Sequence, residues 1–435
     1  MILLSLHSHT NLIFNPGKVK LKAAMDKIKA GQKIRENLPE SIHLLLELIK
    51  LPSTRGNEKE IGRLLKRRIE DYADAAEYVA LPDSLMNDPD YSFKLDDFSY
   101  AGTANLRLKL KGQGNGKTLA FNTHLDVVPP TPGQENAFSP FIKDNKIFGR
   151  GACDAKGQVA VMWLLLKTLH DLQLRPGGDI SVDFVVEEEC GGNGTLWVVR
   201  QGLQAGGAVV FEPTGLQVAN LIRGAVWFEV QTRGKAGHSG SPGSTVSALQ
   251  EAIKAIKSIE KLREELLEVS RRSLPQIALH PNPMPCTFGS LHSGNWPSVT
   301  PAEATLKGVF GFLPPFRRED IQAKLREAVG PDQAEIKFNM LNSNPSFIEE
   351  NHPLVRALLE AATEAHIDSK PEFMNASCDA WRYTEQLEIP AVVFGPGLLS
   401  AAHSSEENMP VDDIRRAALA LIYFIDKWSG LEPAG

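Results

Sequence analysis

The sequence is poor in the features that mark several large classes of protein. Its 435 residues include only four cysteines, and no two of them form a C-x-x-C pair. This excludes a disulfide framework and a thiolate zinc site, and it predicts cysteines that pack as small apolar side chains in a reducing compartment. No apolar run approaches the ~18–20 residues that a membrane-spanning helix needs.

The opening segment, MILLSLHSHT, also lacks the basic front and the small-residue cleavage site of a signal peptide. We therefore expect a frayed or lightly packed terminus in a cytoplasmic protein, without contact with a membrane.

A strong charge of either sign is absent as well. The chain has 47 basic and 53 acidic residues, which gives a net charge of −6, and 42% of its residues are hydrophobic. Nucleic-acid binding depends on an excess of Lys and Arg, so we expect no nucleic-acid partner. The composition is that of a globular protein, and the length predicts two or three domains of roughly 100–200 residues each.

Periodic apolar positions predict the order of the elements. Helices are expected over 40–51 and 57–73, followed by two apolar runs from Asn105 and Thr118 that flank the turn GQGNG. Such runs predict a hairpin or two adjacent strands. Strands then alternate with helices of ~10–15 residues, which predicts an α/β layer with a largely parallel sheet.

The pattern changes between residues 223 and 341. A strand, a long amphipathic helix over 246–272, a second strand, a helix over 318–329 and a third strand are expected there. Strand–helix–strand units that share one sheet are ferredoxin-like in outline. We therefore predict a catalytic domain formed by residues 1–222 and 342–435, with a smaller α+β domain inserted at 223–341.

Acidic residues and histidines recur where predicted strands end. His124 and Asp126 close the strand TLAFNTHLD and share one of its faces, so that the carboxylate can orient the imidazole. Asp154 lies in GRGACDAKG at the start of a helix. Three glutamates close the apolar strand DISVDFVVEEE, at an edge where open α/β sheets bind ligands.

Two further residues also lie just after predicted strands: Glu212 in VVFEPTG and His403 in a glycine-rich loop. Each of these groups alone has an ordinary explanation, such as a core histidine, a helix-start aspartate or a solvated acidic turn. Together, two imidazoles and three carboxylates match a two-metal hydrolytic site if one carboxylate bridges the ions. Glu187 and Glu188 point to opposite sides of a regular strand, so one can bind metal while the other acts as a general base.

Six motifs in this order carry a resemblance to a known family: NTHLDVVP, GRGACDAKG, VVEEECGGNG, FEPTG, RGKAGHSG and GPG…AAHSSEE. From about residue 40 to 428 the chain resembles the M20 metallopeptidases, which include acetylornithine deacetylase and succinyl-diaminopimelate desuccinylase. The resemblance implies a zinc-exopeptidase-like catalytic domain, whose mixed, mainly parallel sheet lies between helices. It also implies an inserted ferredoxin-like lid domain that mediates a homodimer.

The resemblance further implies two Zn²⁺ ions per subunit, with Co²⁺ or Mn²⁺ as alternatives, and a small-molecule amide substrate. The implied metal ligands are His124 and Glu212 on one ion, Glu188 and His403 on the other, and Asp154 on both. Glu187 matches the general base that acts on a metal-bridging water, and Asp126 matches the acid that orients His124. His238 matches a histidine that stabilises the oxyanion in the partner subunit's site.

The sequence departs from the family where many members bind a substrate carboxylate. Gly311 replaces an expected arginine and Ser298 an asparagine, while Arg382 or Arg223 can take the arginine's place. The substrate therefore stays open between an N-acyl amino acid, a peptide cleaved by a carboxypeptidase or dipeptidase, and a formamide such as a formylaminopyrimidine. A serine or cysteine hydrolase has little support, since no G-x-S-x-G motif occurs, and a non-catalytic small-molecule binder is a remote alternative.

Overall fold

The computed structural model describes residues 16–238, 240, 243–330 and 334–434. The opening segment MILLSLHSHT, predicted to be a frayed or lightly packed terminus, lies outside them. Among the described helices, none is both long enough and apolar enough to cross a membrane.

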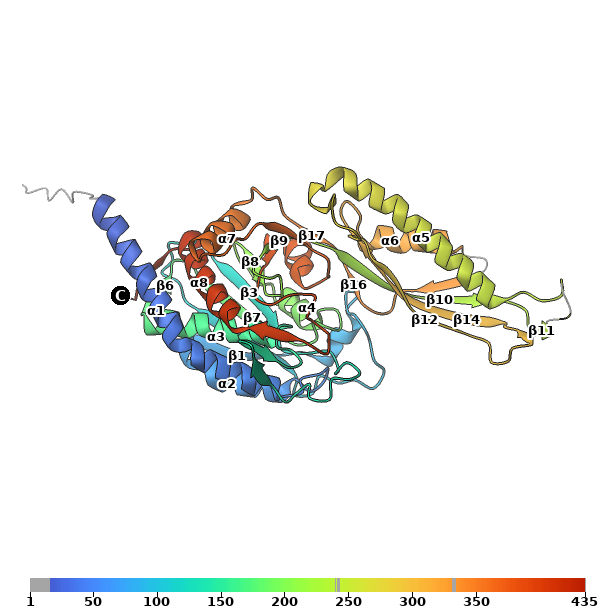
Figure 1. The fold of residues 1–435 in the computed structure, drawn as a ribbon, viewed down its shortest axis with the longest axis horizontal. Coiled ribbons are helices and arrows are strands. Elements are labelled where there is room, and N and C mark those ends of the chain that lie inside the picture. The colour runs from blue at the N-terminus through green and yellow to red at the C-terminus, as the bar shows by residue number, and fades with distance from the viewer. Residues whose placement is uncertain (1–15, 239, 241–242, 331–333, 435) are drawn as a thin grey trace, which may run out of the picture.

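A nine-stranded sheet forms the larger of two bodies (Figure 1). Its order is β1-β2-β7-β3-β8-β19-β9-β17, and β18 pairs with β9. The bounds are β1 Ala75–Ala80, β2 Ala104–Leu110, β3 Leu119–His124, β7 Ile180–Val185, β8 Ala208–Val210, β9 Val218–Ile222, β17 Ser346–Phe347, β18 Pro371–Met374 and β19 Ala391–Val393. The central strands β7, β3, β8 and β19 are parallel, whereas β1, β2 and β17 pair antiparallel with their neighbours. The α/β fold with a mixed sheet is as predicted, and its parallel part lies at the centre.

Helices cover both faces of this sheet. The bounds are α1 Pro16–Ile49, α2 Lys59–Ile69, α3 Lys156–Asp171, α4 Asn193–Arg200, α7 Pro353–Glu364 and α8 Val411–Trp428, with a π-helical turn at Arg382–Gln386. Val209 of β8 packs in the core that holds α3 and α8, while its neighbours Ala208 and Val210 pack on the opposite face with Tyr383. This alternation, with both faces apolar, is expected of a strand buried between two layers of helices.

Two expectations about this body were wrong. The runs from Asn105 and Thr118 form β2 and β3, which do not pair because β7 lies between them. The helix α3 returns the chain after β3 so that β7 pairs in parallel with it, as crossover connections do. The first helix also begins at Pro16 rather than near residue 40, and its early turns project from the body (Figure 1). The apolar periodicity marked only the last part of the helix, although Ile34 and Asn37 before it are also buried and Asn37 donates a hydrogen bond to Asp171 of α3.

The second sheet lies to one side of the first (Figure 1). Its order is β12-β14-β10-β15, and β16 also pairs with β10. Its elements are β10 Gly224–Arg233, α5 Ala248–Ser273, β12 Cys286–Ser293, β14 Glu303–Phe312, α6 Arg318–Val329, β15 Ala334–Lys337 and β16 Asn342–Ser343. With β10, β12, β14 and β15 numbered in chain order, the spatial order 2-3-1-4 is that of a ferredoxin-like sheet. The boundaries at 223 and 341 stay a prediction.

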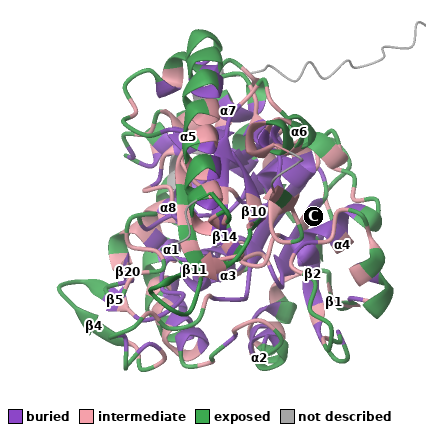
Figure 2. Cartoon of the chain, turned by 90° about the vertical axis from the view of Figure 1, so that its right-hand side faces the viewer, coloured by how far each residue is buried: buried purple, intermediate pink, exposed green. Residues whose placement is uncertain are grey.

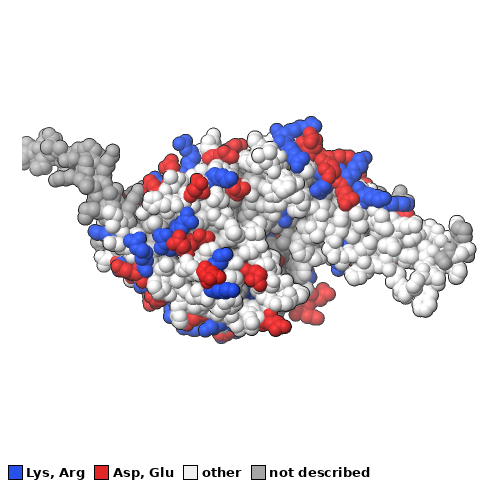
Figure 3. Space-filling model, in the orientation of Figure 1, with Lys and Arg blue, Asp and Glu red and all other residues white. Residues whose placement is uncertain are grey.

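The surface of the second body is dominated by α5. In Figure 2 its outer side is exposed, while many residues of β10 and β14 behind it are buried. Basic and acidic side chains are interspersed along this helix (Figure 3), and several pair locally, as Lys254 does with Glu251 and Arg272 with Glu268.

The remaining elements are short. The strands are β4 Phe141–Lys143, β5 Lys146–Phe148, β6 Leu174–Pro176, β11 Gly237–His238, β13 Val299–Thr300, β20 Asn408–Pro410 and β21 Leu431–Pro433. Single 3₁₀ turns lie at Glu70–Tyr72, Asp83–Asn87 and Pro275–Ile277.

Candidate metal centre

The predicted ligands meet at the carboxyl edge of the parallel strands. His124 is the last residue of β3, and Glu212 follows the end of β8 by two residues. Asp154 lies two residues before α3 begins. Since β3 and β8 are parallel, their ends share one edge of the sheet, which is where such sheets bind ligands.

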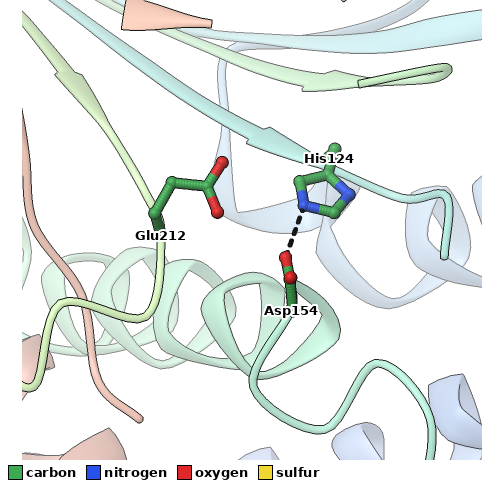
Figure 4. Close-up of side chains that lie close together, drawn as sticks. All are labelled: His124, Asp154 and Glu212. Atoms are coloured by element: carbon green, nitrogen blue, oxygen red, sulfur yellow. Dashed lines mark hydrogen bonds and ion pairs between the residues drawn. The ribbon is translucent and has the colours of Figure 1, made fainter. Parts of the chain in front are cut away.

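His124, Asp154 and Glu212 form one group of possible metal ligands (Figure 4). One ligand atom from each lies within 4.8 Å of the others, and all three residues are buried. The imidazole Nε2 of His124 lies 3.0 Å from Oδ1 of Asp154.

Asp154 also belongs to a second group, with Glu189 and His403. The imidazole Nε2 of His403 lies 3.2 Å from Oδ2 of Asp154 and 3.1 Å from Oε1 of Glu189. The two oxygens of Asp154 therefore face different histidines, so this carboxylate is shared between the groups.

Glu189, rather than Glu188, is the glutamate that the structure places beside His403. The sequence-based assignment of Glu188 to this position was wrong by one residue, for a local reason. The strand β7 ends at Val185, and Glu187 adopts the left-handed conformation with φ of 57°. The strict alternation of a strand therefore ends before the three glutamates.

The carboxylate of Glu187 is buried and surrounded by hydrogen-bond donors. Its carboxylate accepts hydrogen bonds from Nε of Arg55 at 2.6 Å, from Nδ2 of Asn193 at 2.8 Å and from the hydroxyl of Tyr100. These contacts tie the carboxylate to Arg55 and to the loop that holds Tyr100. The geometry thus gives Glu187 a structural ion pair in place of the open position expected of a general base.

The carboxylate of Glu188 instead lies within reach of the charges of the candidate ligands Glu212, His124 and Glu189. Burial raises the pKa of this carboxyl group, and the neighbouring charges of Glu212 and Asp379 raise it further. Among the residues that the structure describes, none donates a hydrogen bond to the Glu188 carboxylate. This carboxylate is therefore available to a reacting molecule.

Asp126 organises both sides of the centre. Its carboxylate accepts hydrogen bonds from the backbone N–H groups of Glu188 and Glu189, each at 3.1 Å. The Nδ1 atom of His124 lies 2.9 Å from the backbone oxygen of Asp126 and 3.6 Å from its carboxylate. The carboxylate of Asp126, which was expected to orient His124, thus binds the backbone of Glu188 and Glu189. The backbone carbonyl of Asp126 contacts the imidazole of His124 instead.

His238 lies far from these residues within its own chain. It is exposed in β11, at the outer end of the second body (Figure 1), and its Nδ1 accepts a hydrogen bond from Gly240 N–H at 3.1 Å. A role at a catalytic centre would therefore require a second copy of the chain.

The electrostatics of the cluster fit a bound cation. Burial raises the pKa of the carboxyl groups of Glu189 and Glu212. Hydrogen bonds to Asp154 and Glu189 raise the pKa of His403 to about 10. Several buried carboxylates thus face two imidazoles, and a divalent cation offsets this excess of negative charge. Nitrogen and oxygen donors without thiolates suit Zn²⁺, Co²⁺ or Mn²⁺.

Further residues around the centre were not predicted from the sequence. Asp379 is buried, accepts a hydrogen bond from the hydroxyl of Thr195 at 2.5 Å, and adds its charge to that of Glu188 and Glu212. It comes from the segment NASCDAWRY, which has no strand or motif that signals a site. Glu189 belongs to the motif VVEEECGGNG, which the sequence did single out, but the position beside His403 was assigned to its neighbour Glu188.

Comparison with known proteins agrees with this picture. The family profile described as Peptidase family M20/M25/M40 matches residues 120–427. Acetylornithine deacetylase from Myxococcus xanthus is 30% identical over 327 residues, covering 73% of this chain and 82% of the relative. N-formyl-4-amino-5-aminomethyl-2-methylpyrimidine deformylase from Bacillus subtilis is 23% identical, covering 77% and 86%. A dinuclear metal-binding peptidase from Bacillus subtilis shares the fold with a TM-score of 0.62 at 14% identity, covering 90% and 98%.

The chain is therefore a hydrolase that acts on amide or peptide C–N bonds, in a metal-dependent class of enzymes. It belongs to the peptidase family M20/M25/M40.

Proposed function

We propose that the chain hydrolyses an amide bond of a small molecule at a two-metal centre, with two Zn²⁺ ions, or Co²⁺ or Mn²⁺, in each subunit. The observation that carries this proposal is the orientation of Asp154, whose two oxygens face His124 and His403 separately. A carboxylate in this position suits a bridge between two ions. His124 and Glu212 would hold one ion, Glu189 and His403 the other, and Asp154 both.

Glu188 is proposed as the general base. When bound, the ions supply Lewis-acid polarisation of the amide carbonyl and lower the pKa of water. The Glu188 carboxylate accepts the proton of the attacking water and passes it to the leaving nitrogen. A positioned base of this kind typically contributes 10²–10⁴-fold to the rate. Asp126 keeps Glu188 in place through the peptide N–H that it binds.

We further propose a homodimer through the inserted domain at 223–341, with His238 reaching the partner subunit's site. Its exposure and its place at the outer end of the second body support this role. A hydrogen-bond donor that stabilises a developing oxyanion is worth on the order of 10²–10³ in rate. The four unpaired cysteines support a cytoplasmic location.

An N-acyl amino acid is one candidate substrate, in line with the acetylornithine deacetylase relative. Its carboxylate requires a cationic partner, and Arg382 does not supply one because its guanidinium is buried and donates to Gly191 and Gln386. Arg223 remains the better candidate. It donates only to backbone carbonyls, those of Asn375 and Gly224, so its charge has no carboxylate partner among the described residues.

A second candidate is a formamide without a carboxylate, in line with the deformylase relative. A Cβ atom at Gly311 would lie 3.0 Å from both Cδ and the backbone oxygen of Pro285, so the expected arginine would fit there only with a small shift of Pro285. A cavity of about 450 Å³ also opens beside the loops that follow Glu212 and precede His403. Its apolar lining residues are Pro213, Ala219, Phe373, Met374, Leu398 and Leu399. This apolar part of the lining suits an uncharged part of a substrate, and Glu372 and His280 also line the cavity.

A panel of N-acetyl, N-succinyl and N-formyl amides and dipeptides, assayed with Zn²⁺ or Co²⁺, tests the proposal. Hydrolysis of any of these amides that is lost on chelation and restored by metal supports the proposed function. Turnover of carboxylate-bearing amides that falls in Arg223→Met would assign the first candidate. Turnover of formamides that is unchanged in Arg223→Met would assign the second. Turnover that persists without metal would contradict the whole proposal.

A further inference from the structure

The two groups of possible metal ligands lie on different kinds of backbone. His124 and Glu212 follow the buried strands β3 and β8, and both are buried. His403 instead lies in a loop, in the left-handed conformation with φ of 60°, and its side chain is 51% exposed. A ligand on an irregular loop needs support from outside the loop if it is to hold one position.

A buried ion pair lies next to this loop. The Nη1 atom of Arg150 donates to Oε2 of Glu407 at 2.6 Å, and both residues are 1% exposed. The other oxygen of Glu407, Oε1, accepts the backbone N–H groups of Cys153 at 3.1 Å and Asp154 at 3.2 Å. Glu407 thus fixes the peptide that holds the shared carboxylate.

Arg150 reaches the histidine loop by two routes, a long direct contact of its Nη2 atom with the backbone oxygen of His403 at 3.5 Å and a shorter route through one hydroxyl group. Its Nη2 atom donates to Oγ1 of Thr131 at 2.7 Å, and Thr131 donates in turn to the backbone oxygen of His403 at 2.6 Å. A continuous set of contacts therefore joins the Asp154 peptide to the His403 carbonyl. No comparable contact extends from Arg150, Glu407 or Thr131 to His124 or Glu212 within the described part of the chain.

We propose that Arg150, Glu407 and Thr131 form a brace that positions His403 relative to Asp154, and that its contact from Thr131 to His403 supports one metal position and not the other. This inference rests on the proposed two-metal centre. The position of Glu189 and His403 needs the brace to hold its loop, whereas His124 and Glu212 are already held by the sheet. Removal of residues that orient metal ligands typically weakens metal binding 10–100-fold.

Thr131→Val is the sharpest variant, since it removes the hydroxyl and leaves the ion pair between Arg150 and Glu407 intact. Glu407→Gln is a stronger perturbation, because it leaves Arg150 buried beside an uncharged group. Thr131→Ser restores the hydroxyl and serves as the rescue variant. Thr232→Val is a matched control, since Thr232 also donates to a backbone oxygen at 2.7 Å, that of Ala248, in the second body.

The experiment is a titration of the metal-free full-length variants with Zn²⁺ alone, followed by calorimetry, with the thermal midpoint of each variant measured beside it. We expect two binding steps in the wild type. In Thr131→Val the Zn²⁺ affinity of the weaker step, that of the position of Glu189 and His403, should fall at least ~10-fold. The affinity of the tighter step, that of His124 and Glu212, should stay within about twofold of the wild type. Thr131→Ser and Thr232→Val should keep both steps as in the wild type.

Equal weakening of both steps, or no weakening of either, would overturn the brace while leaving the two-metal centre in place. Failure of Thr131→Ser to restore the weaker step would also overturn it. A wild-type chain that binds fewer than two ions would overturn the proposed centre and the brace together.

Discussion

Glu188 and Glu187 are adjacent in the chain, yet the residues around their carboxylates differ. Glu188 lies among the candidate ligands, whereas Glu187 is bound by Arg55, Asn193 and Tyr100. We therefore expect Glu188→Gln to lower kcat at least ~100-fold with unchanged metal content and thermal midpoint. Steady-state kinetics, metal analysis and thermal unfolding measure these quantities.

Glu187→Gln provides the comparison for that prediction. It leaves Arg55 without its buried anionic partner, which should lower the free energy of unfolding by roughly 3 kcal/mol. Its effect on kcat should be smaller than that of Glu188→Gln. The reverse order, with a stable Glu187→Gln that has lost turnover, would return the general base to Glu187.

Glu58 makes stability depend on pH. It is 2% exposed at the N-terminus of α2, and neither carboxylate oxygen has a hydrogen-bond partner in the described structure. Burial, together with the charge of Asp126, raises its pKa to about 9. Between the ordinary pKa of 4.5 and about 9 the folded chain holds a proton that the unfolded chain releases. Stability should therefore fall with rising pH in this window, by up to about 1.4 kcal/mol per unit.

Glu58→Gln should remove this contribution. The variant's advantage over the wild type in urea unfolding should be larger at pH 8 than at pH 5 and should vanish below the ordinary pKa of the carboxyl group. A difference that is the same at every pH would show that the carboxyl group ionises normally in the folded chain.

At the scale of elements, the loop between β1 and β2 connects the two bodies. Asp90 in this loop accepts hydrogen bonds from Arg318, the first residue of α6, at 2.5 Å, and from Arg200 at 2.8 Å. Phe93 in the same loop meets Trp227 of β10 edge to face, with ring centroids 6.5 Å apart. These contacts hold the second body against the first on one side of their junction.

Asp90→Asn should loosen this junction, because hydrogen bonds to a charged group contribute about 1.5–3 kcal/mol each. Hydrogen–deuterium exchange should become faster in α6 and in the loop, while exchange in α3 stays unchanged. Asp88→Asn is the matched control, since Asp88 pairs with Arg200 alone and touches no residue of the second body in the contacts described. Unchanged exchange in α6 of Asp90→Asn would contradict the connecting role.

Part of the site and of the sheet could be predicted from the sequence, and part could not. The positions of His124 and Glu212 follow from strand ends, which apolar runs reveal, and that of Asp154 follows from the start of a helix. The register of the three glutamates did not follow, because the left-handed residue at Glu187 depends on partners such as Arg55 that are 132 residues away. The separation of β2 from β3 was equally hidden, since it arises from the return of β7 after α3.

For the molecule as a whole, the exposed position of His238 predicts a site shared between subunits. Chains with Glu188→Gln and chains with His238→Ala should each be strongly impaired. Mixed dimers should contain one intact site, so a 1:1 mixture should regain about a quarter of the wild-type activity if the subunits exchange freely. Activity measured after mixing, with light scattering to establish the dimer, tests this.

No recovery of activity in dimers that do exchange subunits would contradict the shared site. A chain that is monomeric and fully active would contradict both the homodimer and the role of His238.

The proposed metal centre depends on Asp154 being shared by two ions that are held by different partners. Anomalous diffraction at the zinc edge, from crystals of the active Zn²⁺-loaded enzyme, tests it most directly. We expect two peaks in each subunit, both in contact with Asp154. One should be bound by His124 and Glu212, and the other by Glu189 and His403. A single peak in a fully active enzyme, or a peak bound by Glu187 or Glu188 in place of Glu189, would contradict it.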